Sequence, residues 1–112
     1  MKKIAIPLSG GKLCLHFGHS ETFAVMDVDE QGTVMSKQEL TPPPHEPGVL
    51  PSWLHSLGVQ HVITGGMGSR AQGIFYENGI TVTIGAPAMT PEDLASSYMR
   101  GELAGGENVC DH

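Results

Sequence analysis

The chain has 112 residues and a formal net charge of −6, with six lysines and arginines against twelve aspartates and glutamates. This length fits one domain, and the cations form no cluster beyond Lys2 and Lys3, which argues against nucleic-acid binding. The apolar stretch that follows these lysines ends at Pro7, and a stretch of this length is too short for a signal peptide or a membrane span. We therefore expect a soluble, cytoplasmic protein, whose two cysteines favour ligands or free thiols over a disulfide.

The first half of the chain predicts three strands. The apolar run over residues 2–8 predicts a buried strand, which a serine and two glycines end. Residues 22–28 and 33–40 are separated by turn-forming residues and predict a hairpin. The prolines within residues 41–48 lack a backbone donor and block a helix, so we expect a stiff, extended loop there.

The second half predicts helices that alternate with strands. Leucine and tryptophan side chains recur at helical spacing over residues 49–57 and predict a short helix. Strands are expected over residues 60–64 and 80–84, with a helix over residues 69–77 between them that Ser69 would cap.

Thr90 marks the start of the last predicted helix, because a threonine cap is followed there by a proline and two acids. This helix is expected to end at about residue 100, before a glycine. We expect a domain over residues 1–102, followed by a flexible C-terminal tail over residues 103–112.

These elements together predict an α/β fold in a single domain, with a five-stranded mixed sheet flanked by helices. The last two strands and the helix between them should form a parallel crossover. Ligands bind such sheets outside the carboxyl ends of the parallel strands. The loops that begin at Ser9, Gly65 and Gly85 should therefore meet at one edge and form the binding site.

Each cysteine is followed two residues later by a histidine, in the pairs Cys14/His16 and Cys110/His112, and His19 lies close to the first pair. Residues two apart in an extended loop point the same way, so each pair can share one ion. Thiolate with imidazole suits zinc, copper(I) or iron–sulfur species. If the tail folds back, the two pairs would supply a Cys2His2 set. The alternatives are a half-buried cysteine with solvated histidines, and a terminus whose residues are incidental.

A glycine-rich turn over residues 65–68 is the second candidate site. Glycines such as Gly66 let a ligand approach the backbone closely, and the start of the following helix favours an anion. Arg70 adds a positive charge, and Met67 offers a soft thioether. The alternative is an ordinary strand-to-helix turn, since the Lys-Ser/Thr ending of a phosphate-binding loop is absent.

The remaining histidines carry less functional signal. His45, in the proline-rich loop, either hangs over the same edge or is solvated. His55 and His61 lie within a predicted helix and a predicted strand, and we expect both to be structural. No serine lies in a Gly-x-Ser-x-Gly elbow, so hydrolytic chemistry has little support.

Two segments, Cys-Leu-His-Phe-Gly-His-Ser-Glu-Thr-Phe over residues 14–23 and Gly-Gly-Met-Gly-Ser-Arg-Ala over residues 65–71, resemble the dinitrogenase iron–molybdenum cofactor biosynthesis family. This is the NifX and NifB-C-terminal-like group, with small stand-alone members such as the orange protein. The similarity covers nearly the whole chain. It implies a ribonuclease-H-like fold with strand order near 3-2-1-4-5 and an antiparallel second strand.

The resemblance also implies a function. It points to a non-enzymatic carrier or scaffold for a molybdenum-containing metal–sulfur cluster or its precursor, of the Fe–Mo or Mo–Cu type, with cluster donor or acceptor proteins as partners. The cluster contacts carried over are Cys14, His16, His19, Gly66, Met67 and Arg70, with His45, Cys110 and His112 in addition. Two alternatives stay open: a zinc or copper(I) binder or chaperone that uses the Cys-x-His pairs, and a phosphate-binding or hydrolytic domain.

Overall fold

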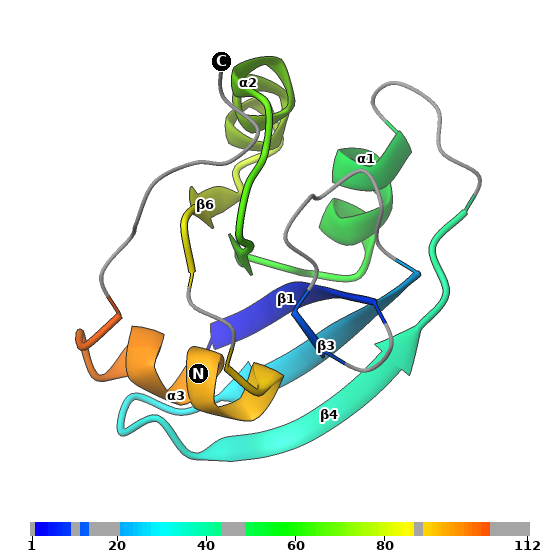
Figure 1. Ribbon diagram of the computed structural model, residues 1–112. Helices are drawn as coiled ribbons and strands as arrows, with labels where there is room; N and C mark the ends of the chain where they lie inside the picture. The colour runs from blue at the N-terminus through cyan, green and yellow to red at the C-terminus, as the bar shows by residue number, and fades with distance from the viewer. Residues whose placement is uncertain (1, 10–11, 14–20, 44–48, 87–88, 104–112) are drawn as a thin grey trace.

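The computed structural model describes residues 2–9, 12–13, 21–43, 49–86 and 89–103 (Figure 1). Its elements follow the order predicted from the sequence, with one short strand in addition. The strands are β1 (Lys2–Ser9), β2 (Lys12–Leu13), β3 (Thr22–Val28), β4 (Val34–Leu40), β5 (His61–Ile63) and β6 (Thr81–Thr83). The helices are α1 (Val49–Ser56), α2 (Ser69–Glu77) and α3 (Pro91–Met99).

The strands form one mixed sheet in the order β4-β3-β1-β5-β6, with β2 paired to β1. Strand β3 is antiparallel to both β1 and β4, whereas β5 is parallel to β1 and β6 is parallel to β5. The predicted five-stranded mixed sheet is thereby confirmed, and its order is the one that the family resemblance implies. The sequence does not predict β2, because two residues are too few to show an alternating pattern.

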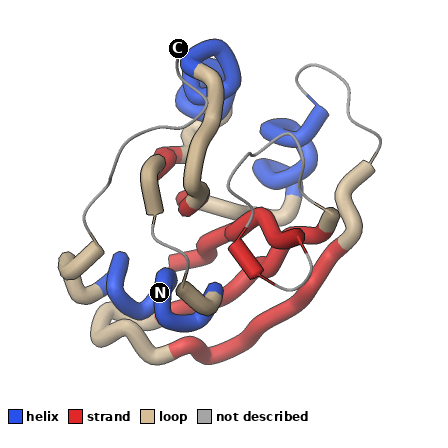
Figure 2. Tube along the Cα trace, in the orientation of Figure 1, coloured by secondary structure: helices blue, strands red, loops and turns tan. Residues whose placement is uncertain are grey.

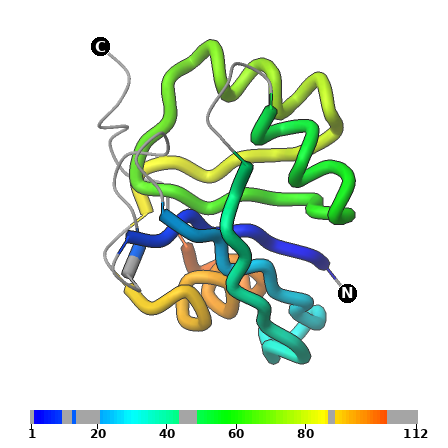
Figure 3. The backbone as a smooth tube through the Cα atoms, turned by 90° about the vertical axis from the view of Figure 1, so that its right-hand side faces the viewer, coloured from blue at the N-terminus to red at the C-terminus, as the bar shows by residue number. Residues whose placement is uncertain are grey.

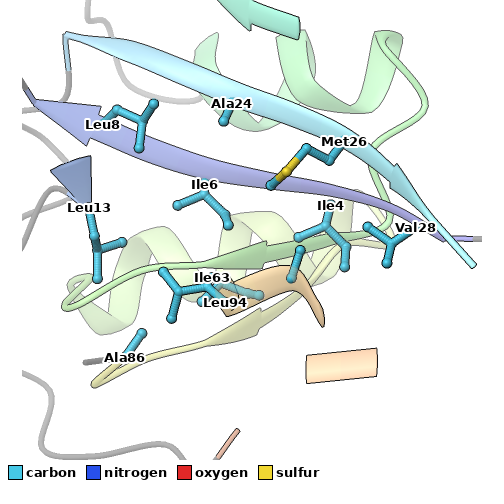
Figure 4. Packing of buried hydrophobic residues seen from close by; sticks show 11 residues of the cluster. Ile4, Ile6, Leu8, Leu13, Ala24, Met26, Val28, Ile63, Ala86 and Leu94 are labelled. Carbon is cyan, nitrogen blue, oxygen red and sulfur yellow. The ribbon is translucent and has the colours of Figure 1, made fainter. Parts of the chain in front are cut away.

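The central strand β1 is buried on both faces of the sheet, which explains its continuous apolar run. Ile4, Ile6 and Leu8 are 0% exposed and pack on the face that α3 covers (Figure 4). Ala5 is also 0% exposed but belongs to the core on the opposite face. Side chains two apart along a strand point to the same face, so β1 contributes to both cores at once.

The helices form a layer on each side of the sheet. Helix α3 lies on one side, and α1 and α2 lie on the other (Figures 2 and 3). The α3-side core, which is the cluster around Ile4 and Leu94, includes Leu103 as a partly buried neighbour. The α1/α2-side core is the cluster around Leu54 and Phe75. No helix within the described part of the chain has the length and apolar character to cross a bilayer.

Helix α3 begins as the sequence predicts. The Thr90 side chain accepts a hydrogen bond from the Asp93 backbone N–H (3.2 Å), and Pro91 occupies the first helical turn. The helix is also tied to the β3–β4 turn, because Ser96 Oγ donates to the carbonyl oxygen of Gly32 at 2.5 Å. The Thr90 contact is internal to the start of the helix, whereas the Ser96 contact joins the middle of α3 to the β3–β4 turn.

Helix α2 begins differently from the prediction. Its cap is Gly68, whose backbone is extended, and no side-chain hydrogen bond is made by this cap. The prediction that Ser69 caps the helix is therefore wrong, since Ser69 is already the first helical residue. The backbone leaves the preceding turn at Gly68, so the first helical turn lacks a capping side chain at that position.

Candidate functional site

The carboxyl ends of the parallel strands lie at one edge of the sheet, as the sequence predicts. Strand β1 ends at Ser9, and the chain leaves β5 and β6 toward the same edge. The backbone N–H of Gly85 donates to the Gly65 carbonyl oxygen at 3.0 Å. The N–H of Ala86 donates to the Thr64 carbonyl oxygen at 3.2 Å, so the two loops are joined beyond the strands. We call residues 9, 64–68 and 85–86 the carboxyl edge.

The glycine-rich turn at this edge is held from both sides. Thr64 is fully buried, and its Oγ1 donates to the carbonyl oxygen of Gly66 at 3.4 Å. From α2, Gln72 Nε2 donates to the Met67 carbonyl oxygen at 2.8 Å, and the Gln72 N–H donates to the Gly68 carbonyl oxygen at 3.1 Å. Sequence reasoning missed Thr64 and Gln72, because neither residue type carries a signal until the turn is folded between them.

The start of α2 has the electrostatic features of an anion site. The first N–H groups of a helix have no intrahelical partner, and the helix dipole places partial positive charge there. Gly68 supplies no capping side chain, and no acidic residue lies in the first turn. Arg70 is exposed in that turn and forms no ion pair with another described residue. By contrast, the first turn of α3 carries Glu92 and Asp93.

Two described residues anchor the segment that carries the first Cys-x-His pair. Leu13 in β2 pairs with Leu8 in β1, directly before residue 14. On the other side, the Glu21 N–H donates to the Leu8 carbonyl oxygen at 2.8 Å, and Ser9 Oγ donates to Glu21 Oε1 at 3.0 Å. Both described ends of the segment 14–20 therefore lie beside the carboxyl end of β1.

Three of the predicted site residues are described, and they differ in accessibility. Arg70 is exposed on α2, whereas Gly66 is buried in the turn. Met67 is 1% exposed and belongs to the α1/α2-side core. The Met67 side chain is therefore part of the core and is not exposed at the carboxyl edge.

The other predicted ligands lie outside the described residues. They are Cys14, His16, His19, His45, Cys110 and His112. Within the described part of the chain, no group of three or more histidine, cysteine, aspartate or glutamate side chains is arranged to hold a metal ion.

His61 lies at the start of β5, at the opposite end of that strand from the carboxyl edge. Its Nδ1 is 2.5 Å from Thr81 Oγ1, its Nε2 is 2.7 Å from Thr83 Oγ1, and its ring stacks on Tyr98 with centroids 4.0 Å apart. Burial, together with the nearby charge of Lys2, lowers the pKa of His61 from 6.5 to about 4. His61 is 3% exposed and its ring is neutral near pH 7, which confirms the predicted structural role.

The fold and this edge define a class of small α/β protein whose candidate site lies at the carboxyl ends of its parallel strands. A family model described as dinitrogenase iron-molybdenum cofactor matches residues 1–101. The chain belongs to this family.

Proteins similar to this chain share nearly its whole length. An uncharacterized Methanocaldococcus jannaschii protein, MJ0580, is 31% identical over 108 residues, which are 92% of this chain and 90% of that protein. The crystal structure of PH0822 superposes with a TM-score of 0.81 at 28% identity, covering 91% of this chain and 92% of that one. The apo orange protein of Desulfovibrio gigas has a TM-score of 0.76 at 21% identity, covering 96% and 95%, and this likeness shows the fold.

Proposed function

We propose that this protein is a non-enzymatic carrier or scaffold for a molybdenum-containing metal–sulfur cluster, or for a precursor of one, of the Fe–Mo or Mo–Cu type. The carboxyl edge would hold the cluster as cargo for transfer between a donor and an acceptor protein. The cytoplasm would suit this role, because thiolate ligands stay reduced there. Membership in a dinitrogenase iron-molybdenum cofactor family supports the class of cargo.

The observation that carries the proposal is the start of α2 at the carboxyl edge. Thiomolybdate-type clusters are anionic and soft. A helix start whose cap residue, Gly68, supplies no side chain, with exposed Arg70 and no acidic residue in the first turn, favours an anion. The chain as a whole carries a net charge of −6, so attraction of an anion has to be local.

The anchoring of the neighbouring segments supports soft ligands at the same edge. Leu13 and Glu21, which flank residues 14–20 in the sequence, both contact Leu8 near the end of β1, and this supports Cys14, His16 and His19 as ligands at that edge. The loop that carries His45 also starts there, because Leu40 at the end of β4 pairs with Phe23. Thiolate and imidazole are suitable donors for such a cluster.

The last Cys-x-His pair, Cys110 and His112, lies nine and eleven residues beyond Gly101 in the sequence. We propose that it contributes additional soft ligands to the cargo. Because its thiol is chemically equivalent to that of Cys14, separate variants are needed to assign the two pairs.

A zinc or copper(I) chaperone that uses the same Cys-x-His pairs is the second candidate function. The two functions differ in the components that the metal-free protein needs in order to bind its cargo. A simple ion binder takes up the bare ion tightly without sulfide, whereas a cluster carrier requires molybdenum and sulfide together. A phosphate-binding or hydrolytic role has less support, since no lysine follows the glycine-rich turn.

Reconstitution of the metal-free protein tests the proposal. We expect tetrathiomolybdate with a copper or iron salt to give a visible chromophore that stays with the protein after desalting, in stoichiometric amount. Metal and sulfide analysis of protein purified without oxygen should find both molybdenum and sulfide. If neither metal salt leaves a stoichiometric chromophore on the protein, the proposal is wrong. Tight uptake of bare zinc or copper(I) alone would favour the chaperone instead.

Substitutions distinguish coordination from electrostatic attraction. Arg70→Gln removes a charge-assisted contact and should weaken cluster binding by roughly tenfold to a hundredfold. Arg100→Gln removes an exposed arginine that follows the last residue of α3 and pairs with Glu102, and should leave binding unchanged. Loss of the chromophore in Cys14→Ser but not in Cys110→Ser would assign coordination to the first pair. Full binding by both serine variants would show that the cluster is held without these thiolates.

A further inference from the structure

Helix α2 exposes one narrow face to solvent. At about 100° per residue, the exposed residues of this helix fall within about 60° on either side of Gly73. They are Ser69, Arg70, Gly73, Tyr76 and Glu77, and we call them the α2 outward face. The buried residue Phe75 points in the opposite direction, into the α1/α2-side core.

Gly73 at the centre of this face is not required by the fold. Its φ is not positive, and a Cβ built on it meets nothing within 4 Å. A glycine in a helix interior nevertheless destabilises the helix relative to alanine. Beside this flat position, Tyr76 is 53% exposed, one of two large hydrophobic side chains with high exposure in the described part of the chain. The face therefore has a flat centre next to an exposed aromatic ring.

The two charges of the α2 outward face oppose the helix dipole. Arg70 lies in the first turn, where the dipole favours an anion, and Glu77 lies in the last turn, where it favours a cation. Neither forms an ion pair with another residue in the described ranges. Both charges thus reduce the stability of the isolated helix, and both lie on the face that Gly73 flattens.

An antiparallel copy of the same helix would satisfy each of these features. With Gly73 packed on Gly73 of the partner subunit, Arg70 lies about 4.5 Å along the axis from the crossing point, and the partner's Glu77 about 6 Å in the same direction. Viewed down the helix axis, Arg70 lies about 60° from Gly73 on its own helix, and the partner's Glu77 lies about 40° from Gly73 of the partner subunit. In the antiparallel pair, these two side chains fall on the same side of the contact. Each Arg70 would then face a Glu77 across the contact. Arg70 would also lie near the negative C-terminal end of the other helix, and Glu77 near its positive N-terminal end.

We propose that the α2 outward face forms a two-fold symmetric contact between two copies of this chain. Such a contact is isologous, because the same residues serve on both subunits. The missing side chain at Gly73 lets the two helices approach closely, since interaxial distance depends on the side chains at the crossing. A helix of nine residues offers a small interface, so the association is weak and depends on concentration.

Sedimentation velocity of the full, metal-free chain tests this, and no cluster is involved, so the result is independent of the proposed function. We expect wild-type protein to shift from monomer toward dimer between about 10 μM and about 1 mM, the range for a small interface. Arg70→Glu and Glu77→Arg should each weaken the dimer about tenfold or more, since each places like charges opposite one another twice. An equimolar mixture of these two variants should restore association, because both contacts then join opposite charges.

The charge variants also exclude a general effect of net charge. Arg70→Glu changes the formal charge from −6 to −8, and Glu77→Arg changes it from −6 to −4. A general repulsion would respond to these changes in opposite directions, whereas the proposed contact is weakened by both. A wild-type monomer over the whole concentration range overturns the proposal, and so does a mixture that behaves like the separate variants.

A substitution at the centre of the face provides a second test. Gly73→Gln should abolish dimerisation by holding the helices apart, while raising the thermal midpoint of the monomer because glutamine favours a helix. The matched change Ser52→Gln, at an exposed position of α1, should leave dimerisation unchanged. Dimerisation of the Gly73→Gln variant at wild-type strength would overturn the proposal.

Discussion

At the residue scale, His61 is the titratable group that the fold perturbs most clearly among the described residues. Its ring nitrogens contact the hydroxyls of Thr81 and Thr83, and its ring is stacked on Tyr98 from α3. Two threonine hydroxyls can serve a neutral imidazole, one as acceptor and one as donor. An imidazolium would carry two donors in a buried place beside Lys2, which is why the pKa falls.

Stability should therefore decrease in acid through His61. The folded pKa is about 4 against 6.5 in the unfolded chain, so the unfolded state binds more protons between these values. Stability from the neutral ring is fully present above pH 6.5 and is lost as the pH falls toward 4, by up to about 3 kcal/mol. Urea unfolding at a series of pH values measures this loss.

The His61→Gln variant isolates the contribution of this ring, because carboxylates also titrate in acid. The variant should lose less stability than wild type between pH 6.5 and 4. The exposed His55→Gln variant serves as the control and should retain the wild-type loss. Equal losses in the His61→Gln variant and in wild type would contradict the prediction.

At the element scale, the two helices that flank the parallel strands start in contrasting ways. Helix α3 has a threonine cap and two acids in its first turn, and α2 has neither. The first arrangement stabilises the helix by itself. The second places no acidic side chain in the first helical turn, which fits the proposed use of the carboxyl edge.

The cap of α3 should contribute measurably to stability. Thr90→Ala removes the acceptor of the Asp93 N–H and should destabilise the protein by about 1 kcal/mol. Denaturant unfolding gives the value. The control is Thr41→Ala, an exposed threonine after β4, which should change stability by less than about 0.5 kcal/mol. A similar loss at both positions would show that the cap is not the cause.

Two glycines should respond oppositely to the same substitution. Gly32 has a φ of +89°, and a Cβ there would lie 2.9 Å from the Ser96 carbonyl oxygen, so Gly32→Ala should destabilise the protein by about 1–3 kcal/mol. Gly73 is helical with open space, so Gly73→Ala should stabilise it by about 0.4–1 kcal/mol. Thermal unfolding of dilute protein checks both, and a shift of the same sign at the two sites would refute the explanation.

Most elements could be predicted because their patterns are local. Residues 22–28 form a strand with the predicted bounds, and the helix predicted after Ser69 ends at Glu77 as expected, since these patterns are visible in the sequence itself. The cap at Gly68 and the strand β2 could not be predicted, because both depend on where a neighbouring segment folds. Hydrogen bonds from Thr64 and Gln72 to the glycine-rich turn depend on the same packing.

At the scale of the whole molecule, one sheet joins two cores. The α3-side core and the α1/α2-side core share the strands β1, β3 and β5, whose side chains alternate between the faces. If one core unfolded, one face of the shared strands would become exposed to solvent and the sheet would lose its support. We therefore expect both cores to unfold together.

Conservative changes in the two cores test this cooperativity. Ile4→Val lies in the α3-side core and Ile80→Val in the α1/α2-side core, and both residues are fully buried. Each should destabilise the protein by about 0.5–1.5 kcal/mol, and the double variant by about the sum. Fluorescence and circular dichroism should report one coincident transition in denaturant. Two separate transitions would contradict a single cooperative unit.

The sequence by itself determined the local and chemical features of this protein: its helices and all its described strands except β2, the soft side chains at Cys14, His16 and His19, the glycine-rich turn and the family. These follow from residue type and spacing, which need no contact between distant segments. Only the tertiary structure decided that Leu13 and Glu21 meet the end of β1, that Met67 is a core residue and that Gly73 faces outward. The reason is physical: burial and accessibility depend on which surfaces pack together, and residues far apart in the chain provide those surfaces.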